Sequence, residues 1–404
     1  MCFVTVPHPL GMISKEEVNA KVDAAFDDIV KAATAWTPSK EKQDAQVKPY
    51  PAKRFKFSGT YADVNDMFQK RKWSLSLPIV PPTVDKVAAM LKGTKRNPAE
   101  VLWVVPPRQG MLTVELAPGV MAGAKPEHMP LLIATVEAMA DPVAAWRGPT
   151  TTTAATVPVF FISGPIIEKL KLNPGTGTAG GENPVTNALG YFVNLVGDVV
   201  GGSVPPNFDK STHGSSADLV AMVFTENAKE NPWKTTYAEE AGFKPSDSIV
   251  THFSAYLGNA NIDHDSKTGQ RLLTTLSTGL LGSASGLASC LADYDATYAI
   301  NNKVSFAFIV LCPEHAATIA KDFPDQRAAR DFMRETAAMP YKFYSQETCV
   351  PGKDFGPYDE NTFIPRFKKT ESIKFFVSGG PGKQSQIWVP FPQVFKPVSK
   401  KIAE

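Results

Sequence analysis

The fold is indicated most clearly by residues 201–233, which read GGSVPPNFDKSTHGSSADLVAMVFTENAKENPW. Glycine and proline pairs break the backbone first, and a polar loop at residues 209–213 follows them. An apolar run at residues 219–224 then leads directly into Glu226 and Asn227. Loops can aim side chains while a rigid scaffold holds them, so such a stretch is where binding and catalytic groups usually lie. We therefore expect a buried strand here that delivers polar side chains to the edge of a sheet.

The rest of the chain alternates between apolar runs typical of strands and segments typical of helices. Runs rich in β-branched and aromatic residues predict strands, and a capping residue or proline ahead of a periodic segment predicts a helix. Strands are expected at residues 72–80, 101–105, 112–117, 158–162, 250–255, 304–311, 372–377 and 387–389, and helices at 81–92, 126–140, 183–200 and 272–292. The continuous apolar run at residues 101–105 is typical of a strand covered on both faces. This alternation predicts a mixed α/β fold, with a largely parallel sheet flanked by helices.

One tripeptide, Pro-Glu-His, occurs at residues 126–128 and 313–315, and at both places it is expected to begin a helix. Proline suits the first helical turn, and a glutamate beside it complements the helix dipole. Because this local chemistry accounts for the echo, an internal duplication is the less favoured interpretation.

The amino-terminal region is expected to be separate from the rest. A strand at residues 2–6 is followed at once by a helix at residues 14–35, which opens with a capping-box pattern. This order is typical of the last βα unit of a larger domain, so the region is interpreted as a short βα remnant. We divide the chain into residues 1–38, a charged and proline-bounded linker at 39–52, and an α/β body at 53–404, with 163–233 as the junction if that body forms two subdomains.

Composition excludes several classes of function. With 42 basic and 40 acidic residues the net charge is +2, so no general field attracts nucleic acid or anionic lipid. No apolar stretch approaches the roughly 18 residues that span a bilayer, and the amino terminus lacks the basic region of a signal peptide. The four cysteines lie far apart without zinc spacing, which favours a reducing compartment. We expect a cytoplasmic protein that binds small molecules, alone or as a homo-oligomer, and neither nucleic acid nor membranes.

Several short patterns resemble the UGSC-motif family of (seleno)proteins. Residues 3–10 (FVTVPHPL) and the alanine-rich helix that follows EEV at 16–18 are similar to the carboxyl-terminal end of that domain. The longer members are similar to the remainder through LPIVPPT (77–83), TVE (113–115), THG (212–214), EN (226–227) and GGPGK (379–383). The family is named for a selenocysteine-Gly-Ser-Cys signature, and no Cys-Gly-Ser-Cys occurs in this chain. The resemblance implies redox or sulfur chemistry, with the signature in a separate redox subunit, upstream of Met1, or lost.

His213 is the first candidate for acid–base catalysis, because histidine titrates near neutrality and Asp209 and Asp218 lie near it in the sequence. The alternative is a histidine that braces its turn through hydrogen bonds. Glu226 would act as a base or ligand, and Asn227 would fix a substrate carbonyl. The structural alternative is that Asn227 caps the next turn and Glu226 pairs with a nearby lysine.

A second group of candidates would bind the substrate or its anionic group. Arg108 follows two prolines at a strand end, where a guanidinium suits a carboxylate or phosphate, although Glu115 could instead be its partner. Two glycine-rich loops, at 175–181 and 378–383, offer free amides, but the first matches neither nucleotide-binding pattern and is more typical of a lid or plain turn. The predicted binding set is Arg108, Glu115, Thr212, Gly380 and Lys383.

Metal and thiol chemistry receive less support. His252, Asp263, His264 and Asp265 form a loose set of possible ligands, but their spacing matches no metal motif and a solvated loop is favoured. Cys290 lies near two acids that would raise its pKa, which favours a structural cysteine, and Cys312 in an apolar strand is expected in the core. No metal is therefore assigned, and the cofactor is unknown.

These candidates predict a small-molecule enzyme, a lyase, hydrolase or redox-linked catalyst, that acts on a sulfur-containing or carboxylated substrate. His213 would be the acid or base, and Arg108 with Lys383 would hold an anionic group. The alternative function is a non-catalytic partner subunit that docks a separate redox domain.

Overall fold

The structure, a computed structural model, describes residues 13–35, 51–181, 183–204, 213–256, 258–282, 306–343, 359–367, 369–391 and 396–403, together with residues 4, 6 and 394. Residues Met1–Lys48 and Pro49–Glu404 form two separate compact units. The boundary between them along the chain falls within the predicted linker at 39–52.

The amino-terminal unit contains the helix α1 (Lys15–Thr34). The Ser14 hydroxyl accepts a hydrogen bond from the Glu17 amide, and the Glu17 carboxylate accepts one from the Ser14 amide, which confirms the capping box. Within α1 only Ala25 is buried. The strand predicted at residues 2–6 lies largely outside the described residues.

The body contains two four-stranded sheets. Sheet 1 has the order β12-β5-β3-β4 and consists of β3 (Val157–Ser163), β4 (Met222–Thr225), β5 (Ile249–Ala255) and β12 (Val398–Lys401). Sheet 2 has the order β10-β7-β11-β6 and consists of β6 (Asn259–Ile262), β7 (Ala307–Leu311), β10 (Ile373–Val377) and β11 (Gln384–Trp388). Two small two-stranded sheets pair β1 (Val101–Val105) with β2 (Gly110–Thr113) and β8 (Ala338–Pro340) with β9 (Phe363–Pro365).

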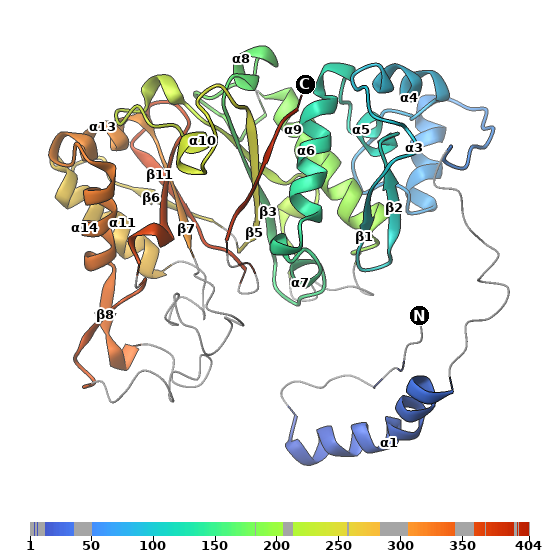
Figure 1. The fold of residues 1–404 in the computed structure, drawn as a ribbon, viewed down its shortest axis with the longest axis horizontal. Coiled ribbons are helices and arrows are strands. Elements are labelled where there is room, and N and C mark those ends of the chain that lie inside the picture. The colour runs from blue at the N-terminus through green and yellow to red at the C-terminus, as the bar shows by residue number, and fades with distance from the viewer. Residues whose placement is uncertain are drawn as a thin grey trace. The chain divides into compact units, whose positions relative to one another are not determined.

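Helices cover the outer face of each sheet, so the body has four layers in the order helix, sheet, sheet, helix (Figure 1). Sheet 1 is covered by α6 (Met129–Ala140) and α9 (Pro184–Asn194), and sheet 2 by α11 (Gly269–Gly282), α13 (Pro313–Asp322) and α14 (Gln326–Thr336). Shorter helices are α3 (Tyr61–Lys70), α4 (Val84–Leu91), α5 (Ala117–Met121), α7 (Arg147–Thr150), α8 (Ile166–Lys169) and α10 (Tyr237–Glu240). None of the described helices combines the length and the apolar character that crossing a membrane requires.

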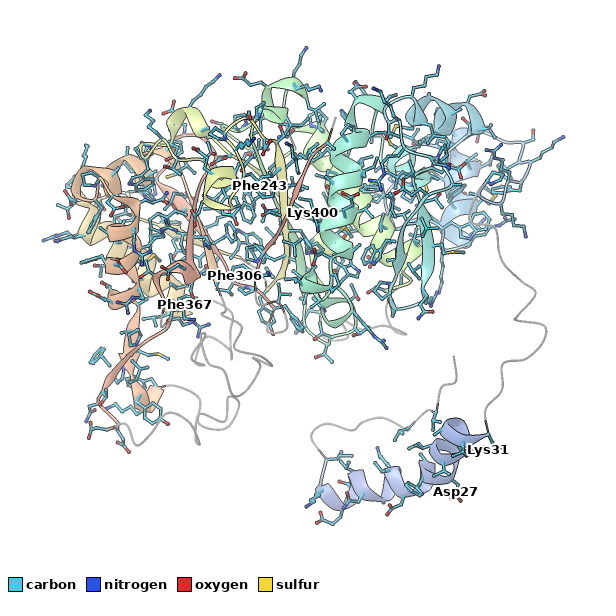
Figure 2. The ribbon with its side chains drawn as sticks, viewed as in Figure 1. Asp27, Lys31, Phe243, Phe306, Phe367 and Lys400 are labelled. Carbon is cyan, nitrogen blue, oxygen red and sulfur yellow. The ribbon has the colours of Figure 1, made fainter. Side chains whose placement is uncertain are left out.

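Alternation along the strands explains how one sheet can face two apolar layers. In β3, Phe160 and Ile162 pack against the covering helices, whereas Phe161 points between the sheets. There the Phe161 ring stacks on Phe308 of β7, with centroids 4.4 Å apart. A layer of such rings joins the sheets face to face, and Figure 2 shows Phe306 within this central layer.

The two sheets repeat one topology. In sheet 1, β3 pairs in parallel with β4 and antiparallel with β5, and β5 pairs antiparallel with β12. In sheet 2, β7 pairs in parallel with β10 and antiparallel with β11, and β11 pairs antiparallel with β6. The first half of the body contains β3, β4, β5 and β6, and the second half contains β7, β10, β11 and β12. The last strand of each half, β6 or β12, therefore lies in the sheet of the other half.

The body is therefore an internal duplication of topology with exchanged final strands. The Pro-Glu-His echo does not mark this duplication, because residues 126–128 precede β3 whereas residues 313–315 follow β7. The chemistry of the first helical turn still explains why the tripeptide occurs twice. The expectation that the chain has no internal duplication was wrong, because the strand order repeats in the two sheets.

The mixed α/β class is confirmed, and the structure corrects the expected balance of strand directions. Among the described strands only β3–β4 and β7–β10 pair in parallel, and the other pairings are antiparallel. Parallel neighbours need a long crossover, and helical crossovers join only these two pairs, with α8 and α9 in one and α13 and α14 in the other.

Three predicted strands differ from the structure. In place of a strand at 112–117, β2 ends at Thr113 and α5 begins at Ala117. Residues 72–80 form an irregular segment after α3, in which the Ile79 amide donates to Asn65 Oδ1 at 2.7 Å instead of to a neighbouring strand. Residues 101–105 do form β1, but Val101 and Val104 are 42% and 48% exposed because β1 has only β2 beside it. A continuous apolar run therefore did not mark a strand covered on both faces.

Candidate functional site

Four polar or sulfur-containing side chains follow four strands at one end of the body. Ser163 ends β3, Glu226 follows β4, Ser378 follows β10 and Cys312 follows β7. An isolated antiparallel bridge joins Glu226 to Ser378, and the register of β7 and β10 places Cys312 beside Ser378. In Figure 1 the helices α8, α10 and α13, which come after these strands in the chain, lie along the upper side of the view. The carboxyl ends of parallel strands are the usual place for a ligand in α/β folds.

Glu226 carries a buried carboxyl with one unsatisfied oxygen. The residue is 3% exposed, and its Oε1 accepts a hydrogen bond from the Tyr237 amide at 2.7 Å, whereas Oε2 has no partner. Burial raises the pKa of Glu226 to about 7, against the hydrogen bond from Tyr237. The negative charges of Glu239 and Glu240 raise this pKa further. A carboxyl with such a pKa exchanges its proton near neutral pH, as a general acid or base must.

Ser163 is the polar neighbour of the Glu226 carboxyl. One position earlier along each strand, Ile162 pairs with Thr225, so Ser163 lies opposite Glu226 and on the same face of the sheet. The Ser163 hydroxyl lowers the pKa of Glu226, although neither its Oγ nor Glu226 Oε2 has a partner of good hydrogen-bond geometry. Buried polar groups are rarely left unsatisfied, so this pair is where a bound water molecule or substrate group would complete the hydrogen bonding.

Asn227 joins the two sheets beside this carboxyl. Its amide donates to the Val377 carbonyl at 2.8 Å, and its Nδ2 donates to the Gly379 carbonyl at 3.0 Å. Its Oδ1 accepts from the Glu230 amide at 3.4 Å, as expected for the alternative in which Asn227 caps the next turn. The Asn227 side chain is thus bound within the fold, and its predicted contact with a substrate carbonyl stays a prediction.

The two glycine-rich loops meet above this junction. The Gly379 amide donates to the Pro174 carbonyl at 2.8 Å. Gly380 lies so close to Thr176 that a Cβ atom on it would be 2.2 Å from the threonine Oγ1. The structure therefore brings Gly380 to the same junction as Glu226 and Asn227, in a contact that no larger residue fits.

Lys383 lies further along the same loop and does not offer a free anion site. The amides of Gly382 and Lys383 donate to the Glu314 carboxylate at 2.6 Å and 3.0 Å. Lys383 Nζ donates to the His264 carbonyl at 2.9 Å. The amides of this loop bind a carboxylate that belongs to the protein itself, and the predicted role of Lys383 in holding a substrate anion stays a prediction.

His213 lies at the other end of β4 from Glu226. It precedes the short turn η4 (Ser216–Asp218), in which the Ala217 carbonyl accepts from Asn194 at the carboxyl end of α9. The amino end of α9 adjoins the first glycine-rich loop, and an eleven-residue helix is about 16 Å long. The structure does not bring His213 to Glu226, because a strand separates the two positions, and this corrects the expectation of one shared site. Thr212 lies outside the described residues.

Arg108 and Glu115 also lie away from the strand ends. Arg108 is exposed in the turn between β1 and β2, where its amide donates to the Gly201 carbonyl at 2.9 Å. This hairpin lies on the far side of α6 from sheet 2 (Figure 1). The Glu115 carboxylate accepts from the Ala52 amide at 3.0 Å and pairs with Arg54 at 3.6 Å. Glu115 is therefore a structural partner, though of Arg54 rather than Arg108.

The loose set of possible metal ligands is divided between the sheets. His252 is buried in β5, where its ring stacks on Phe160 at 4.5 Å and burial lowers its pKa to about 3. Asp263 follows β6 of sheet 2, and His264 and Asp265 beside it are exposed. Across the described part of the chain, no group of three or more His, Cys, Asp or Glu side chains could hold a metal ion.

One feature near the strand ends was not predicted from the sequence. Cys312 is buried, as expected, but it stands at the start of α13 with the buried His315 three residues later. The available signal was the sequence Cys-Pro-Glu-His at the junction of a predicted strand and a predicted helix. Cys290 lies outside the described residues.

No protein-family model matches this chain, and no curated protein matches it in sequence. The resemblance to the UGSC-motif family therefore stays a prediction, and the chemistry of the site rests on its own geometry.

Proposed function

We propose that this protein is a small-molecule enzyme in which the Glu226 carboxyl transfers a proton to or from a carboxylated or sulfur-containing substrate, as in a lyase or hydrolase. One observation carries the proposal, namely the unsatisfied Oε2 of a buried carboxyl whose pKa lies near 7. A buried carboxyl that serves only the fold is normally ion-paired or fully hydrogen-bonded. Perturbed carboxyls of this kind cluster at functional sites.

The neighbours of Glu226 fit this role. In its protonated form Glu226 is neutral, so it can donate a hydrogen bond to an anionic substrate group without repulsion. In its ionised form it can accept a proton from the same position. Ser163 Oγ would supply a second hydrogen bond to the substrate, since it makes no hydrogen bond of good geometry within the protein.

A substrate screen with matched variants tests the proposal. Panels of small carboxylic acids, thiols and thioesters are incubated with the protein at pH 7, and their consumption is followed by proton NMR. We expect the wild type and Glu230→Gln, an exposed carboxylate four positions away, to consume one class of compound at the same rate. Glu226→Gln should be slower by roughly a hundredfold or more, the usual effect of removing a general acid or base. Equal rates for Glu226→Gln and the wild type would remove Glu226 from the chemistry.

A second candidate function, a non-catalytic subunit that docks a separate redox protein, is favoured by α1. The spacing of its exposed apolar residues places them on one face of the helix. These residues are Val22, Phe26, Ile29 and Val30, and each is between 39% and 56% exposed. Figure 2 shows the charged side chains of Asp27 and Lys31 on the same helix. Inactivity of the purified chain, together with a co-purifying redox protein that is lost on Phe26→Asp, would favour this function over the enzyme.

A further inference from the structure

A pocket lies where the edge strands of the two sheets flank the aromatic layer. β12 is the edge strand of sheet 1 and β10 is the edge strand of sheet 2, and both contribute to the lining. The rest of the lining comes from α10, from Phe306 just before β7, and from the short turn η7 (Thr370–Ser372). The pocket has a volume of about 700 Å³. Sites for small molecules typically measure about 300–1,000 Å³.

The two edge strands turn polar side chains toward this pocket. Along β10, Phe376 packs in the layer between the sheets, and Lys374 faces the same way because it lies two positions earlier. Along β12, Val398 packs with Ala138 of α6, so Ser399 faces the opposite side, toward sheet 2. The layer of rings between the sheets therefore ends in a pocket with polar walls.

Lys374 belongs to a cluster that carries an excess of positive charge. Arg330 Nη1 and Lys374 Nζ both donate to the same atom, Glu240 Oε1, at 2.7 Å and 3.1 Å. The side chains of Glu240 and Arg330 are each 15% exposed, and that of Lys374 is 20% exposed. Arg330 Nε is buried and has no hydrogen-bond partner in the described part of the chain. A largely buried cation without a full share of a carboxylate favours a bound anion.

The remaining charges around the pocket do not offset this excess. Glu371, the other carboxylate of the lining, forms an ion pair with Arg327 at 2.7 Å. Glu239 is not part of the lining, and its carboxylate accepts hydrogen bonds from the Thr236 amide and hydroxyl at the start of α10. Two further exposed lysines line the pocket, Lys369 and Lys396. The lining is therefore cationic.

The other part of the lining is aromatic. Tyr237 and Phe306 are 4% and 3% exposed, and the partly buried Phe243 packs against the same core. Figure 2 shows Phe243 and Phe306 in the central region between the two sheets. A ligand with an apolar body would remove apolar surface from water by packing against these rings. An inorganic anion would not.

An inward-facing lysine on an edge strand also has a structural explanation, because such a charge keeps other strands from pairing with the edge. That role requires the charge alone. It does not require a second cation on the same carboxylate oxygen, nor a pocket lined by further lysines and by aromatic rings.

We propose that this pocket binds a small carboxylate that has an apolar body. The carboxylate pairs with Lys374 and the neighbouring lysines, and the body packs against Tyr237, Phe243 and Phe306. Lys374 lies four positions before Ser378, the neighbour of Glu226, which is roughly 13 Å along an extended strand. The pocket is therefore separate from the Glu226 carboxyl, and the proposal does not depend on the acid–base role of Glu226.

Isothermal titration calorimetry of the full chain tests the proposal with three probes. 2-Naphthoate has both a carboxylate and an apolar body, 2-naphthamide has the same body without the charge, and inorganic phosphate has the charge without the body. We expect 2-naphthoate to bind at one site. The other two probes should bind at least roughly tenfold more weakly, because each lacks one of the two contacts.

Variants of the lining locate the bound probe. Lys374→Met keeps the length of the side chain but removes its charge, and it should weaken 2-naphthoate binding roughly tenfold or more. Ala241→Leu enlarges a side chain in the lining and should weaken binding to at least the same degree by filling the pocket. Lys321→Met, which removes an exposed lysine outside the lining, should bind as the wild type does. Glu226→Gln should also bind normally, which keeps this test independent of the proposed acid–base chemistry.

Three results would overturn the proposal: no binding of 2-naphthoate at millimolar concentration, equal affinity for 2-naphthamide or phosphate, or binding that Lys374→Met and Ala241→Leu leave unchanged. Melting curves from circular dichroism show whether each variant is folded. If Lys374→Met does not fold, Lys396→Met removes a cation from an exposed position of the lining, and unchanged binding by it and by Ala241→Leu would equally overturn the proposal.

Discussion

Replacing Glu226 with glutamine should raise the free energy of unfolding at pH 8 by roughly 2 to 3 kcal/mol, because the folded protein no longer has to hold an ionised carboxyl in a buried position. The folded-state pKa of about 7 lies above the ordinary value of 4.5, so the wild type binds this proton more tightly when folded. The stability it confers is complete below pH 4.5 and is lost as the pH rises through 7. Urea denaturation at several pH values should show equal stability near pH 4.5 and a difference that grows to a plateau above pH 7.

The matched control is Glu230→Gln, which removes an exposed carboxyl from the same loop and should leave the stability curve unchanged. A Glu226→Gln protein that is less stable than the wild type at every pH would show that the carboxyl is structural. Stabilisation by the same substitution that abolishes turnover is the trade-off expected at a functional site.

Deleting residues 396–404 should prevent the body from folding, although the deletion removes only the last strand of the chain. β12 covers the outer edge of β5, and Val398 and Ile402 are 6% and 3% exposed. Two buried aliphatic side chains contribute about 1.5–3 kcal/mol each, and the lost backbone hydrogen bonds leave the edge of β5 unpaired. Lys400 also loses its ion pair with Asp141 at 2.7 Å. The sum is comparable to the whole stability of a typical domain, about 5–15 kcal/mol.

Soluble yield, size-exclusion chromatography and circular dichroism measure this outcome. A synthetic peptide that carries residues 394–404 should restore folding when it is added during refolding, since it replaces a strand that the second half donates to the first. Deletion of residues 1–48 is a longer truncation at the other terminus, and it should leave the melting temperature of the body unchanged because within α1 only Ala25 is buried. An unchanged melting temperature after removal of residues 396–404 would contradict the strand exchange.

The strands and helices with strong apolar patterns were predicted from the sequence, and the exchange between sheets was not. β3, β5, β7 and β10 correspond to predicted apolar runs because their residues are buried on both faces. β6 and β12 have the sequences NANI and VSKK, which carry little apolar signal because each lies at the edge of a sheet. Edge strands of four residues are recognised by the neighbour that they pair with, and sequence alone does not give that neighbour.

The sequence predicted the part of the site that follows a single strand. It did not predict the part where segments distant in the chain come together. Glu226 and Asn227 follow an apolar run, and this local signal placed them correctly at the end of β4. His213 is close to them in the sequence, but β4 lies between His213 and Glu226, so the two residues are at opposite ends of this strand. Asp263 and Ser385 are far from His315 in the chain, and they reach its imidazole only through the folding of sheet 2.

Net charge also conceals how charges are distributed. Arg71 lies over the rings of Trp73 and Phe55, at 4.7 Å and 5.5 Å from their centroids. The two short segments around these rings also carry the exposed residues Lys53, Lys56, Lys70 and Lys72. A charge of +2 for the whole chain therefore includes a local cationic and aromatic surface, and the expected lack of affinity for nucleic acid stays a prediction.

The acid–base role of Glu226 is tested most directly by titrating its carboxyl carbon. The protein is labelled with ¹³C at the glutamate Cδ, and the Glu226 resonance is identified by its absence from the spectrum of Glu226→Gln. Spectra recorded from pH 4 to pH 9 should give a midpoint of about 7 for this resonance. A midpoint near the ordinary value of 4.5 would contradict the assignment of Glu226 as the proton-transferring group.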